Sequence, residues 1–352
     1  MGKARVSWLS HAGPARAIQL QLSGLLTLYL IAMTKSRLFE KRFISQPFVQ
    51  CARVTSLAVL ILAGLVALTL FLPAFLAARK LIRRPAPDPP ADPAALGLPH
   101  EEVSFQTEDG LTLRGWFIPT PAPARGTIIF CHGHSGSMDG DLGYVPAFHQ
   151  HGYSVLMFDF RGHGRSDGAR VSMGYHERND VLAAIRFLEG RGLHAVGLLG
   201  FSMGGATAIA SAPLSPAVKA VVTDSAFATL DTTVAGGLRA QGVPEPIPRL
   251  VGRLAVKVAD LLLACRLEDA YPIRWVSQVA PRGLFIIHGE DDIYVPASDA
   301  RRLYELAGEP KELWLVPGAG HREIDRTAPE EYLPRILAFF DRFFPDRGGD
   351  TA

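Results

Sequence analysis

The segment AVGLLGFSMGGATAIA, residues 195–210, places a serine at the centre of a glycine-rich turn. The apolar run before the turn reads as a buried strand, and the alanine-rich run after it reads as a helix. Ser202 between Gly200 and Gly204 matches the G-x-S-x-G nucleophile elbow, in which a strained strand-to-helix turn exposes the serine hydroxyl. Side chains at the two glycine positions would collide with the neighbouring strand and helix. A chance match to so short a motif is the alternative, so the rest of the chain must decide.

Strand-like and helix-like segments alternate on both sides of this turn. The strand-like segments are 102–106, 111–118, 127–131, 154–158, 195–199, 218–223, 283–287 and 312–316. The helical candidates are 145–151, 177–189, 203–212, 297–307 and 329–344. The first two strands read as an antiparallel pair joined by the turn Glu108-Asp109-Gly110. Continuous apolar strands alternating with helices predict an α/β fold with a mostly parallel sheet covered on both faces.

Charge and cysteine content narrow the class of protein. The 352-residue chain has a formal net charge of +2. No basic stretch dominates its globular part, which argues against a nucleic-acid-binding protein. Its three cysteines are too widely separated for a disulfide framework or a zinc site. Cys131 lies in an apolar run, where we expect a buried small hydrophobe.

A long apolar segment precedes the globular part. Residues 54–78 are 25 consecutive residues without a charge, dominated by Leu, Ala and Val. A helix of about 20 apolar residues spans the hydrocarbon core of a bilayer, so we expect a single transmembrane helix that anchors the protein to a membrane. A cleaved signal peptide is the alternative, and the long preceding segment and the basic residues that follow argue against it.

The N-terminal basic segment, residues 1–53, contains a second apolar stretch at 18–34. This stretch could be another span, an interfacial helix, or the product of a misplaced start, with Met33 as the true one. Basic residues lie on both sides of the main apolar segment: Lys35, Arg37, Lys41, Arg42 and Arg53 before it, and Arg79, Lys80, Arg83 and Arg84 after it. Counting positive charges therefore favours, by one residue, an extracytoplasmic globular domain.

The remaining boundaries follow from composition. Residues 79–95 are basic and then proline-rich, which predicts a stiff spacer that lifts the domain off the membrane. The catalytic domain is expected at 96–345, followed by a short tail at 346–352. Residues 228–280 interrupt the alternation and predict a lid insertion. Its helical face of Leu250, Leu254, Val258 and Leu261 either packs on the body of the domain or lines an acyl pocket.

A nucleophilic serine needs a base, an acid that orients the base, and an oxyanion hole. The candidate base is His321, in the loop PGAGH between the last strand and the final helix, and its late position fits the order Ser, acid, His. A surface loop histidine is the alternative. The candidate acid is Asp292, on the loop HGEDDIYVP at 288–296. Asp291 beside it and Asp224 after the preceding strand are its competitors.

The oxyanion hole is expected from two backbone N–H groups. One belongs to Met203, at the N-terminus of the helix after the serine, and the other to His134, in the loop HGHSG after an apolar strand. The pair His132 and His134 suggests a metal site, but a metallohydrolase needs more ligands nearby and the His-x-His-x-Asp-His motif is absent. We therefore expect no metal, and no cofactor, since no phosphate-binding glycine loop occurs in a fitting place.

A further stretch, DFRGHGRSDG at 159–168, follows the next strand. We expect Asp159, Arg161 and Gly162 to shape the loop beside the site, and His163 to be structural or at its rim.

Together these motifs resemble the α/β-hydrolase superfamily, near its membrane-anchored abhydrolase-domain and lysophospholipase-like members. The matching elements occur in the family's order over 96–344: His132-Gly133, DFRGHGRS at 159–166, GFSMGG at 200–205, 289–296 and Gly320-His321. The resemblance implies an eight-stranded sheet and a triad of Ser202, Asp292 and His321. The chain departs from common relatives at His134, where a small or amide residue is frequent. Only the backbone of that residue is needed for catalysis.

We therefore expect a serine hydrolase that cleaves carboxylic esters through an acyl-enzyme, with lipid-like or acylated substrates favoured by the anchor and the lid. A peptidase or thioesterase could use the same triad. A non-catalytic hydrolase-fold scaffold is a further alternative, although such proteins usually lose a triad member. Haloalkane dehalogenases and epoxide hydrolases need a carboxylate nucleophile where this chain has Ser202. Acyl length, membrane side and oligomeric state are left open by the sequence.

Overall fold

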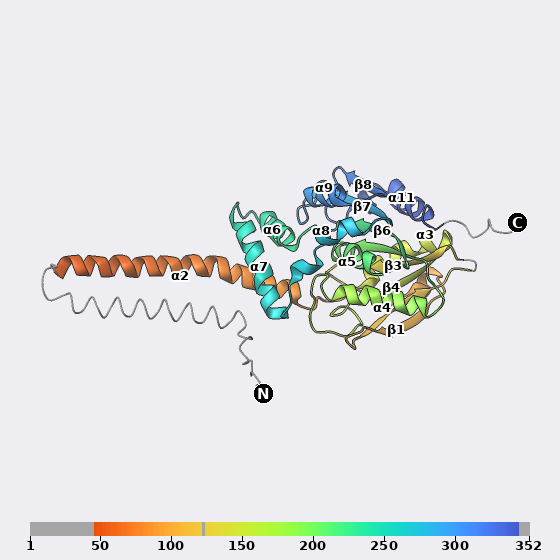
Figure 1. Ribbon diagram of the computed structural model, residues 1–352, viewed down its shortest axis with the longest axis horizontal. Helices are drawn as coiled ribbons and strands as arrows, with labels where there is room; N and C mark the ends of the chain where they lie inside the picture. The colour runs from red at the N-terminus through yellow and green to blue at the C-terminus, as the bar shows by residue number, and fades with distance from the viewer. Residues whose placement is uncertain (1–45, 122–123, 345–352) are drawn as a thin grey trace, which may run out of the picture. The chain divides into compact units, whose positions relative to one another are not determined.

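The structure, a computed structural model, describes residues 46–121 and 124–344. The chain divides into two compact units, Met1–Ala67 and Leu68–Ala352, and helix α2 (Gln46–Ile82) passes from the first into the second (Figure 1). The apolar stretch at 18–34 and the tail at 346–352 lie outside the described residues.

Eight strands of the second unit form one sheet in the order β1-β2-β4-β3-β5-β6-β7-β8. The strands are β1 (Glu101–Gln106), β2 (Thr112–Ile118), β3 (Gly126–Cys131), β4 (Tyr153–Phe158), β5 (Val196–Phe201), β6 (Val218–Asp224), β7 (Gly283–Gly289) and β8 (Lys311–Val316). The β1–β2 and β2–β4 pairs are antiparallel, and the other neighbours are parallel. This mostly parallel sheet confirms the expected fold class. Strands of a parallel sheet are buried on both faces, which explains their continuous runs of β-branched residues and leucine.

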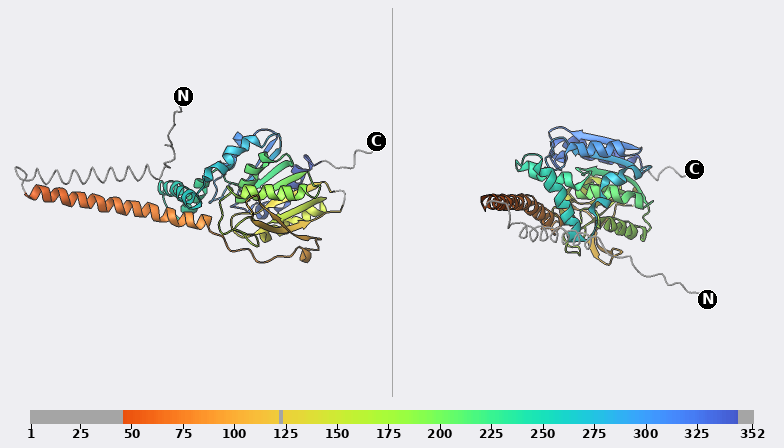
Figure 2. Two further views of the ribbon diagram at one scale, coloured as in Figure 1. Left: turned by 60° about the horizontal axis from the view of Figure 1, so that its bottom comes forward. Right: turned by 60° about the vertical axis from the view of Figure 1, so that its left-hand side comes forward.

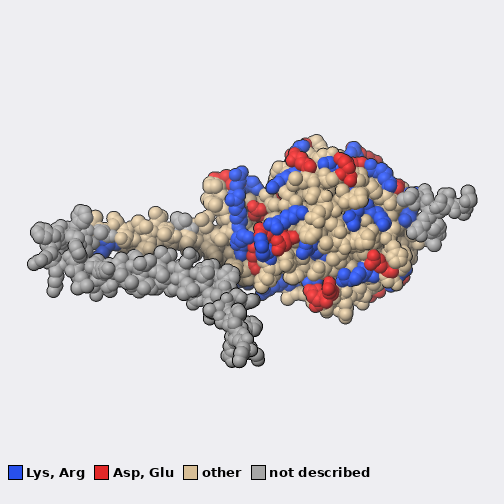
Figure 3. Space-filling view, in the orientation of Figure 1, with Lys and Arg blue, Asp and Glu red and all other residues tan. Residues whose placement is uncertain are grey.

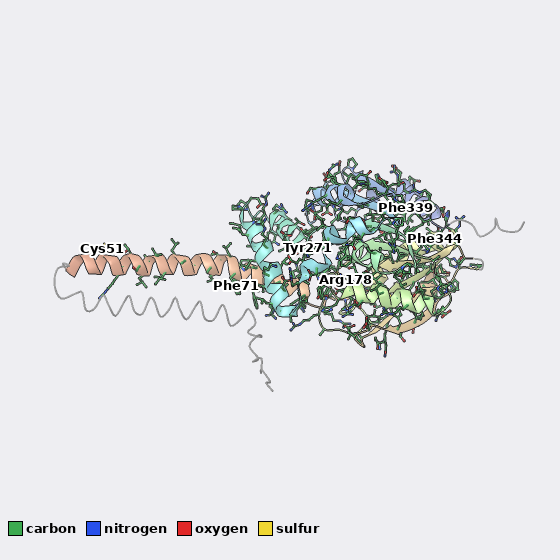
Figure 4. The ribbon with its side chains drawn as sticks, viewed as in Figure 1. Cys51, Phe71, Arg178, Tyr271, Phe339 and Phe344 are labelled. Carbon is green, nitrogen blue, oxygen red and sulfur yellow. The ribbon has the colours of Figure 1, made fainter. Side chains whose placement is uncertain are left out.

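Helices cover both faces of this sheet (Figure 2). One core packs α4 (Glu177–Glu189), α5 (Met203–Ser211) and α9 (Ala297–Leu306) against the sheet. The opposite core packs α3 (Val145–Gln150) and α11 (Pro329–Asp341), which contributes Phe339, against the other face (Figure 4). The sheet is thus buried on both sides, and its loops at the carboxyl ends of the parallel strands are free to carry a site.

The insertion between β6 and β7 contains α6 (Leu230–Ala240), α7 (Ile247–Leu263) and α8 (Pro272–Trp275). The expected face of α7 is divided in the structure. Val258 is buried and Leu254 packs against the core, but Leu250 is 48% exposed and Leu261 is 82% exposed. The fully buried side of α7 is centred on Ala255 and Ala259. Each of these alanines comes one residue after a member of the expected face, Leu254 or Val258, so the buried side is rotated relative to that face.

Helix α2 is long and apolar enough to cross a membrane over Arg53–Ile82, with a mean hydropathy of 2.7. Its last turns, however, belong to the second unit, where Ala74 and Ala78 are fully buried in the core. Phe71 just before them is 51% exposed (Figure 4). The apolar run expected to end in a membrane at residue 78 therefore ends inside the domain, because small alanine side chains let the helix pack closely.

The segment 79–95, expected to be a stiff spacer, is hydrogen-bonded to the domain. The guanidinium of Arg84 donates to four backbone carbonyl oxygens of residues 163–168. The Asp88 carboxylate accepts from Ser137 N–H at 2.8 Å, and Ala91 N–H donates to Asp139 at 2.8 Å. On the face seen in Figure 3, groups of Lys and Arg and groups of Asp and Glu are both scattered between wide uncharged areas. The compact unit thus begins well before residue 96.

Candidate active site

Ser202 occupies the turn between β5 and α5, with a φ of 52°. Such a backbone conformation is strained for a residue with a side chain. The close approach of the surrounding backbone explains the glycines: a Cβ at Gly200 would lie 2.5 Å from the Gly204 carbonyl oxygen, and a Cβ at Gly204 would lie 1.9 Å from that of Cys131. The Ser202 N–H donates to the Asp224 carbonyl at 2.8 Å, which fixes the turn on β6.

The His321 imidazole lies between the serine and an acid. Its Nε2 is 3.0 Å from Ser202 Oγ, and its Nδ1 is 2.6 Å from Asp292 Oδ2. The loop after β8 carries the histidine, and the loop after β7 carries the aspartate. The side chain of His321 is 22% exposed, so one edge of the ring faces solvent while the other contacts a buried carboxylate.

The three candidate acids differ in their surroundings. Asp292 Oδ1 accepts from the N–H groups of Tyr294 and Val295, at 2.9 and 2.8 Å, which leaves Oδ2 for His321. Asp291 is exposed to solvent. The Asp224 carboxylate is occupied by the hydroxyls of Ser225 and Tyr332, at 2.8 and 2.7 Å. The geometry therefore favours Asp292 over both competitors.

The orientation of the peptide that joins Gly133 to His134 is fixed by a hydrogen bond from the His132 ring to the Gly133 carbonyl. His132 is buried, its Nε2 accepts the Phe160 N–H at 3.0 Å, and its Nδ1–H therefore donates to the Gly133 carbonyl at 2.7 Å. Because a trans peptide points its C=O and N–H in opposite directions, the His134 N–H is turned away from His132. Burial also lowers the pKa of His132 well below its ordinary value and keeps the ring neutral.

Met203, the other expected oxyanion donor, is the first residue of α5. The first N–H groups of a helix have no intrahelical acceptor, and the helix dipole adds positive potential there. A carbonyl oxygen of a substrate attacked by Ser202 would develop its negative charge at this terminus.

The histidines near Ser202 are engaged in hydrogen bonds to the protein. His134 Nε2 lies 2.8 Å from the Leu81 carbonyl oxygen, and the fully buried His163 places its two ring nitrogens 3.0 and 2.9 Å from the carbonyls of Arg161 and His134. Within the described ranges, no group of three or more His, Cys, Asp or Glu side chains could hold a metal ion.

Arg322 was not singled out from the sequence, although it directly follows His321. Its φ is 56°, its N–H donates to Ser225 Oγ at 3.1 Å, and its Nη2 donates to Asp141 at 2.6 Å. The guanidinium also lies 4.2 Å from the centre of the Phe201 ring. Arg322 thus ties the histidine loop to the elbow and to the segment after β3. Only its adjacency to His321 could have indicated this.

A family model described as alpha/beta hydrolase fold matches residues 126–262 of this chain. The uncharacterized protein YqkD of Bacillus subtilis is 32% identical over 241 residues, which cover 66% of this chain and 76% of that protein. The Pyrococcus furiosus esterase Pf2001 superposes with a TM-score of 0.63 at 27% identity, over 75% of this chain and 98% of the esterase. A membrane phospholipase A shares the fold, with a TM-score of 0.54 at 20% identity over 84% of this chain and 100% of that chain.

The chain belongs to the α/β-hydrolase superfamily. The fold and the esterase neighbour support a hydrolase.

Proposed function

We propose that this protein is a serine hydrolase that cleaves carboxylic esters through an acyl-enzyme intermediate. The observation that carries the proposal is the position of His321, whose ring lies within hydrogen-bond distance of both Ser202 Oγ and Asp292 Oδ2. The likeness to a Pyrococcus furiosus esterase supports the ester as the substrate bond.

In this mechanism Ser202 attacks the ester carbonyl while His321 Nε2 takes the hydroxyl proton. Asp292 orients the imidazole and stabilises the imidazolium that forms. The N–H groups of Met203 and His134 stabilise the oxyanion. His321 then returns the proton to the leaving alcohol. In the second half a water molecule, deprotonated by His321, attacks the acyl-enzyme and releases the acid.

We further propose that α2 anchors the protein to a membrane and that its substrates are lipid-like or acylated. The support is the part of α2 before Ala74, where most of the described large apolar side chains from Val54 to Leu72 are exposed, together with the exposed Leu250 and Leu261 of the insertion. The one-residue excess of basic residues before this segment favours an extracytoplasmic catalytic unit. A reporter enzyme fused to the C-terminus, active only on one side of the membrane, tests that orientation.

The test of the activity uses the full-length protein in detergent micelles, with p-nitrophenyl esters from acetate to palmitate. We expect turnover that Ser202→Ala and His321→Ala each lower by a factor on the order of 10⁶. Ser211→Ala is the matched control, because Ser211 lies at the far end of the same helix and its hydroxyl donates to the Thr207 carbonyl. The optimum of chain length then separates a short-chain esterase from a lipase.

A fluorophosphonate probe reports on the nucleophile without any assumption about the substrate. Labelling that Ser202→Ala abolishes, with no turnover of any ester, would redirect the proposal to a thioesterase or peptidase. Protein that is neither labelled nor active would favour a non-catalytic scaffold and overturn the proposal.

A further inference from the structure

The carbonyl of Leu81 is one of the last carbonyls of α2, which have no helical N–H partner. In an α-helix the Leu81 oxygen would accept from the N–H of residue 85. Residue 85 is a proline and has no N–H to donate. The Leu81 oxygen is bonded instead by a side chain from the loop after β3, with His134 Nε2 at 2.8 Å. The next carbonyl, that of Ile82, accepts from Val171 N–H at 3.0 Å.

This contact fixes the protonation of the His134 ring. A carbonyl oxygen can only accept, so Nε2 must carry the hydrogen. Burial lowers the pKa of His134, which keeps the ring neutral and its tautomer fixed. The His134 carbonyl oxygen meanwhile lies 2.9 Å from His163 Nε2. The His134 side chain is therefore held by the Leu81 carbonyl, and the His134 carbonyl lies within hydrogen-bond distance of the His163 ring.

Two further residues that follow α2 bind the same region. Arg84 Nη1 donates to the Gly168 carbonyl at 2.8 Å and Arg84 Nη2 to the Gly164 carbonyl at 2.6 Å. These bonds hold the turn that carries His163. Asp88 and Ser137 exchange two hydrogen bonds, at 2.8 and 3.1 Å. A Cβ at Gly136 would lie 2.1 Å from the Asp88 carboxylate, so the glycine makes room for this contact.

We propose that His134 is a positioning residue, whose side chain fastens the oxyanion-hole peptide to the end of α2, so that the end of this helix is a component of the active site. The proposal rests on the ester hydrolase function proposed above. That mechanism uses only the backbone N–H of His134, and the proposal adds a role for the His134 side chain. If the helix end were only a tether, its contacts would fall on any convenient surface. Apart from the bond between the Ile82 carbonyl and Val171, the hydrogen bonds described above fall on the loop 132–139 and on the turn that carries His163.

A loss of this bond predicts a specific kinetic defect. The triad does not include His134, so the nucleophile and its base stay aligned. The N–H that receives the developing negative charge would then be fixed only by the bond from His132 to the Gly133 carbonyl, and its direction would be less well defined. Oxyanion-hole donors act on the transition state and not on the bound substrate. The effect should therefore appear in kcat, with KM unchanged.

The experiment compares two amides that differ by one methylene in the full-length protein in detergent micelles. The His134→Gln side chain can reach the Leu81 oxygen with its amide N–H, and the shorter His134→Asn side chain cannot. His149→Asn is the matched control, because His149 Nε2 likewise lies 3.1 Å from a backbone carbonyl, that of Pro119, at the opposite end of the sheet. Ser202→Ala defines the activity that depends on the proposed nucleophile.

We expect His134→Asn to lower kcat on p-nitrophenyl butyrate roughly tenfold with KM within about twofold, since loss of a whole oxyanion donor costs about 10²- to 10³-fold. His134→Gln should stay within about threefold of the wild type, and His149→Asn should be unchanged. Amide hydrogen exchange should rise over 132–139 in His134→Asn alone. Equal kcat values for the Gln and Asn variants overturn the inference and leave the hydrolase intact. Wild-type activity that Ser202→Ala does not remove overturns the proposed function, and the inference with it.

Discussion

Gly236 of α6 lies directly against the backbone of Tyr294, and a Cβ at Gly236 would stand 2.1 Å from the Tyr294 carbonyl oxygen. The Tyr294 ring lies edge-on to that of His321, with centroids 5.9 Å apart, and the Tyr294 N–H donates to Asp292. The insertion between β6 and β7 is thus in contact with the loop that carries the proposed catalytic acid. A change at this contact should be transmitted to the site.

Two adjacent glycines of α6 test this contact. Gly236→Ala forces α6 or the acid loop to move, because backbone stands where the methyl would be. We expect it to destabilise the fold by about 1–3 kcal/mol and to lower kcat roughly 10- to 100-fold, since small misplacements of catalytic groups are costly. Gly237→Ala meets no atom within 4 Å. It should raise the free energy of unfolding by about 0.5–1 kcal/mol and leave kcat alone. Thermal unfolding and steady-state kinetics measure both, and a Gly236→Ala enzyme with wild-type kcat would refute the coupling.

The neighbouring carboxylates Asp291 and Asp292 offer an equally close comparison. Asp292→Asn keeps the shape of the side chain but removes the charge that orients His321, so kcat should fall by a factor on the order of 10⁴. Asp291 is exposed, and it is held through its backbone, whose N–H donates to the Ala319 carbonyl at 3.0 Å. Asp291→Asn should therefore leave kcat within about twofold. A loss of activity at Asp291 with Asp292→Asn still active would reverse the assignment of the acid.

The sheet could be predicted from the sequence because its strands are continuous apolar runs. Each expected strand is present within two residues of its expected ends, and Glu177–Glu189 is helical over its full expected length. The loops at the carboxyl ends of the strands bring Ser202, His321 and Asp292 together, as the order of the motifs suggests. Motifs of this kind depend on local backbone geometry, and for that reason their positions in the structure can be predicted from the sequence.

The role of residues 68–95 could not be predicted in the same way. A run of Leu, Ala and Val has the same sequence pattern whether the helix faces lipid or protein. The sequence therefore did not indicate that Ala74 and Ala78 are buried in the core. The basic residues after it suggested a membrane flank, yet Arg84 donates to backbone carbonyls of the domain. Backbone acceptors have no signature in the sequence. The contact between His134 and Leu81 was hidden for the same reason.

Arg161 gives the fold a specific sensitivity to acid. Its guanidinium donates two hydrogen bonds to Asp109, at 2.7 and 2.9 Å, and others to the buried Asp180. The first pair holds the pKa of Asp109 well below its ordinary value of 3.8. In the folded protein Asp109 stays ionised at a pH where the unfolded chain has taken up a proton, so this pair stabilises the fold above about pH 3.8 and loses its contribution as the pH falls below.

Asp109→Asn should therefore flatten the fall in thermal midpoint between about pH 4 and pH 2, while lowering the midpoint at neutral pH. Thermal unfolding followed by circular dichroism across this range measures both effects. Parallel curves for the wild type and the variant would show that the pair between Arg161 and Asp109 does not contribute to acid sensitivity.

The boundary of the catalytic unit can be tested by truncation. A chain that starts at residue 96 loses the buried Ala74, Ala78 and Ile82 and the four carbonyl contacts of Arg84. Burial of one large aliphatic side chain contributes about 1.5–3 kcal/mol, and a hydrogen bond to a charged group contributes about 1.5–3 kcal/mol. We therefore expect this chain to unfold at a much lower temperature than a chain that starts at residue 68, and to hydrolyse esters more slowly.

Arg84→Gln in the longer chain separates the two contributions. It removes the contacts to residues 163–168 but keeps the buried alanines, so its thermal midpoint should fall between those of the two truncated chains. Its kcat should fall with its stability if the turn that carries His163 depends on Arg84. Equal midpoints and equal kcat values for chains starting at residues 68 and 96 would mean that the segment after α2 is dispensable. It would then act only as the spacer that its composition suggests.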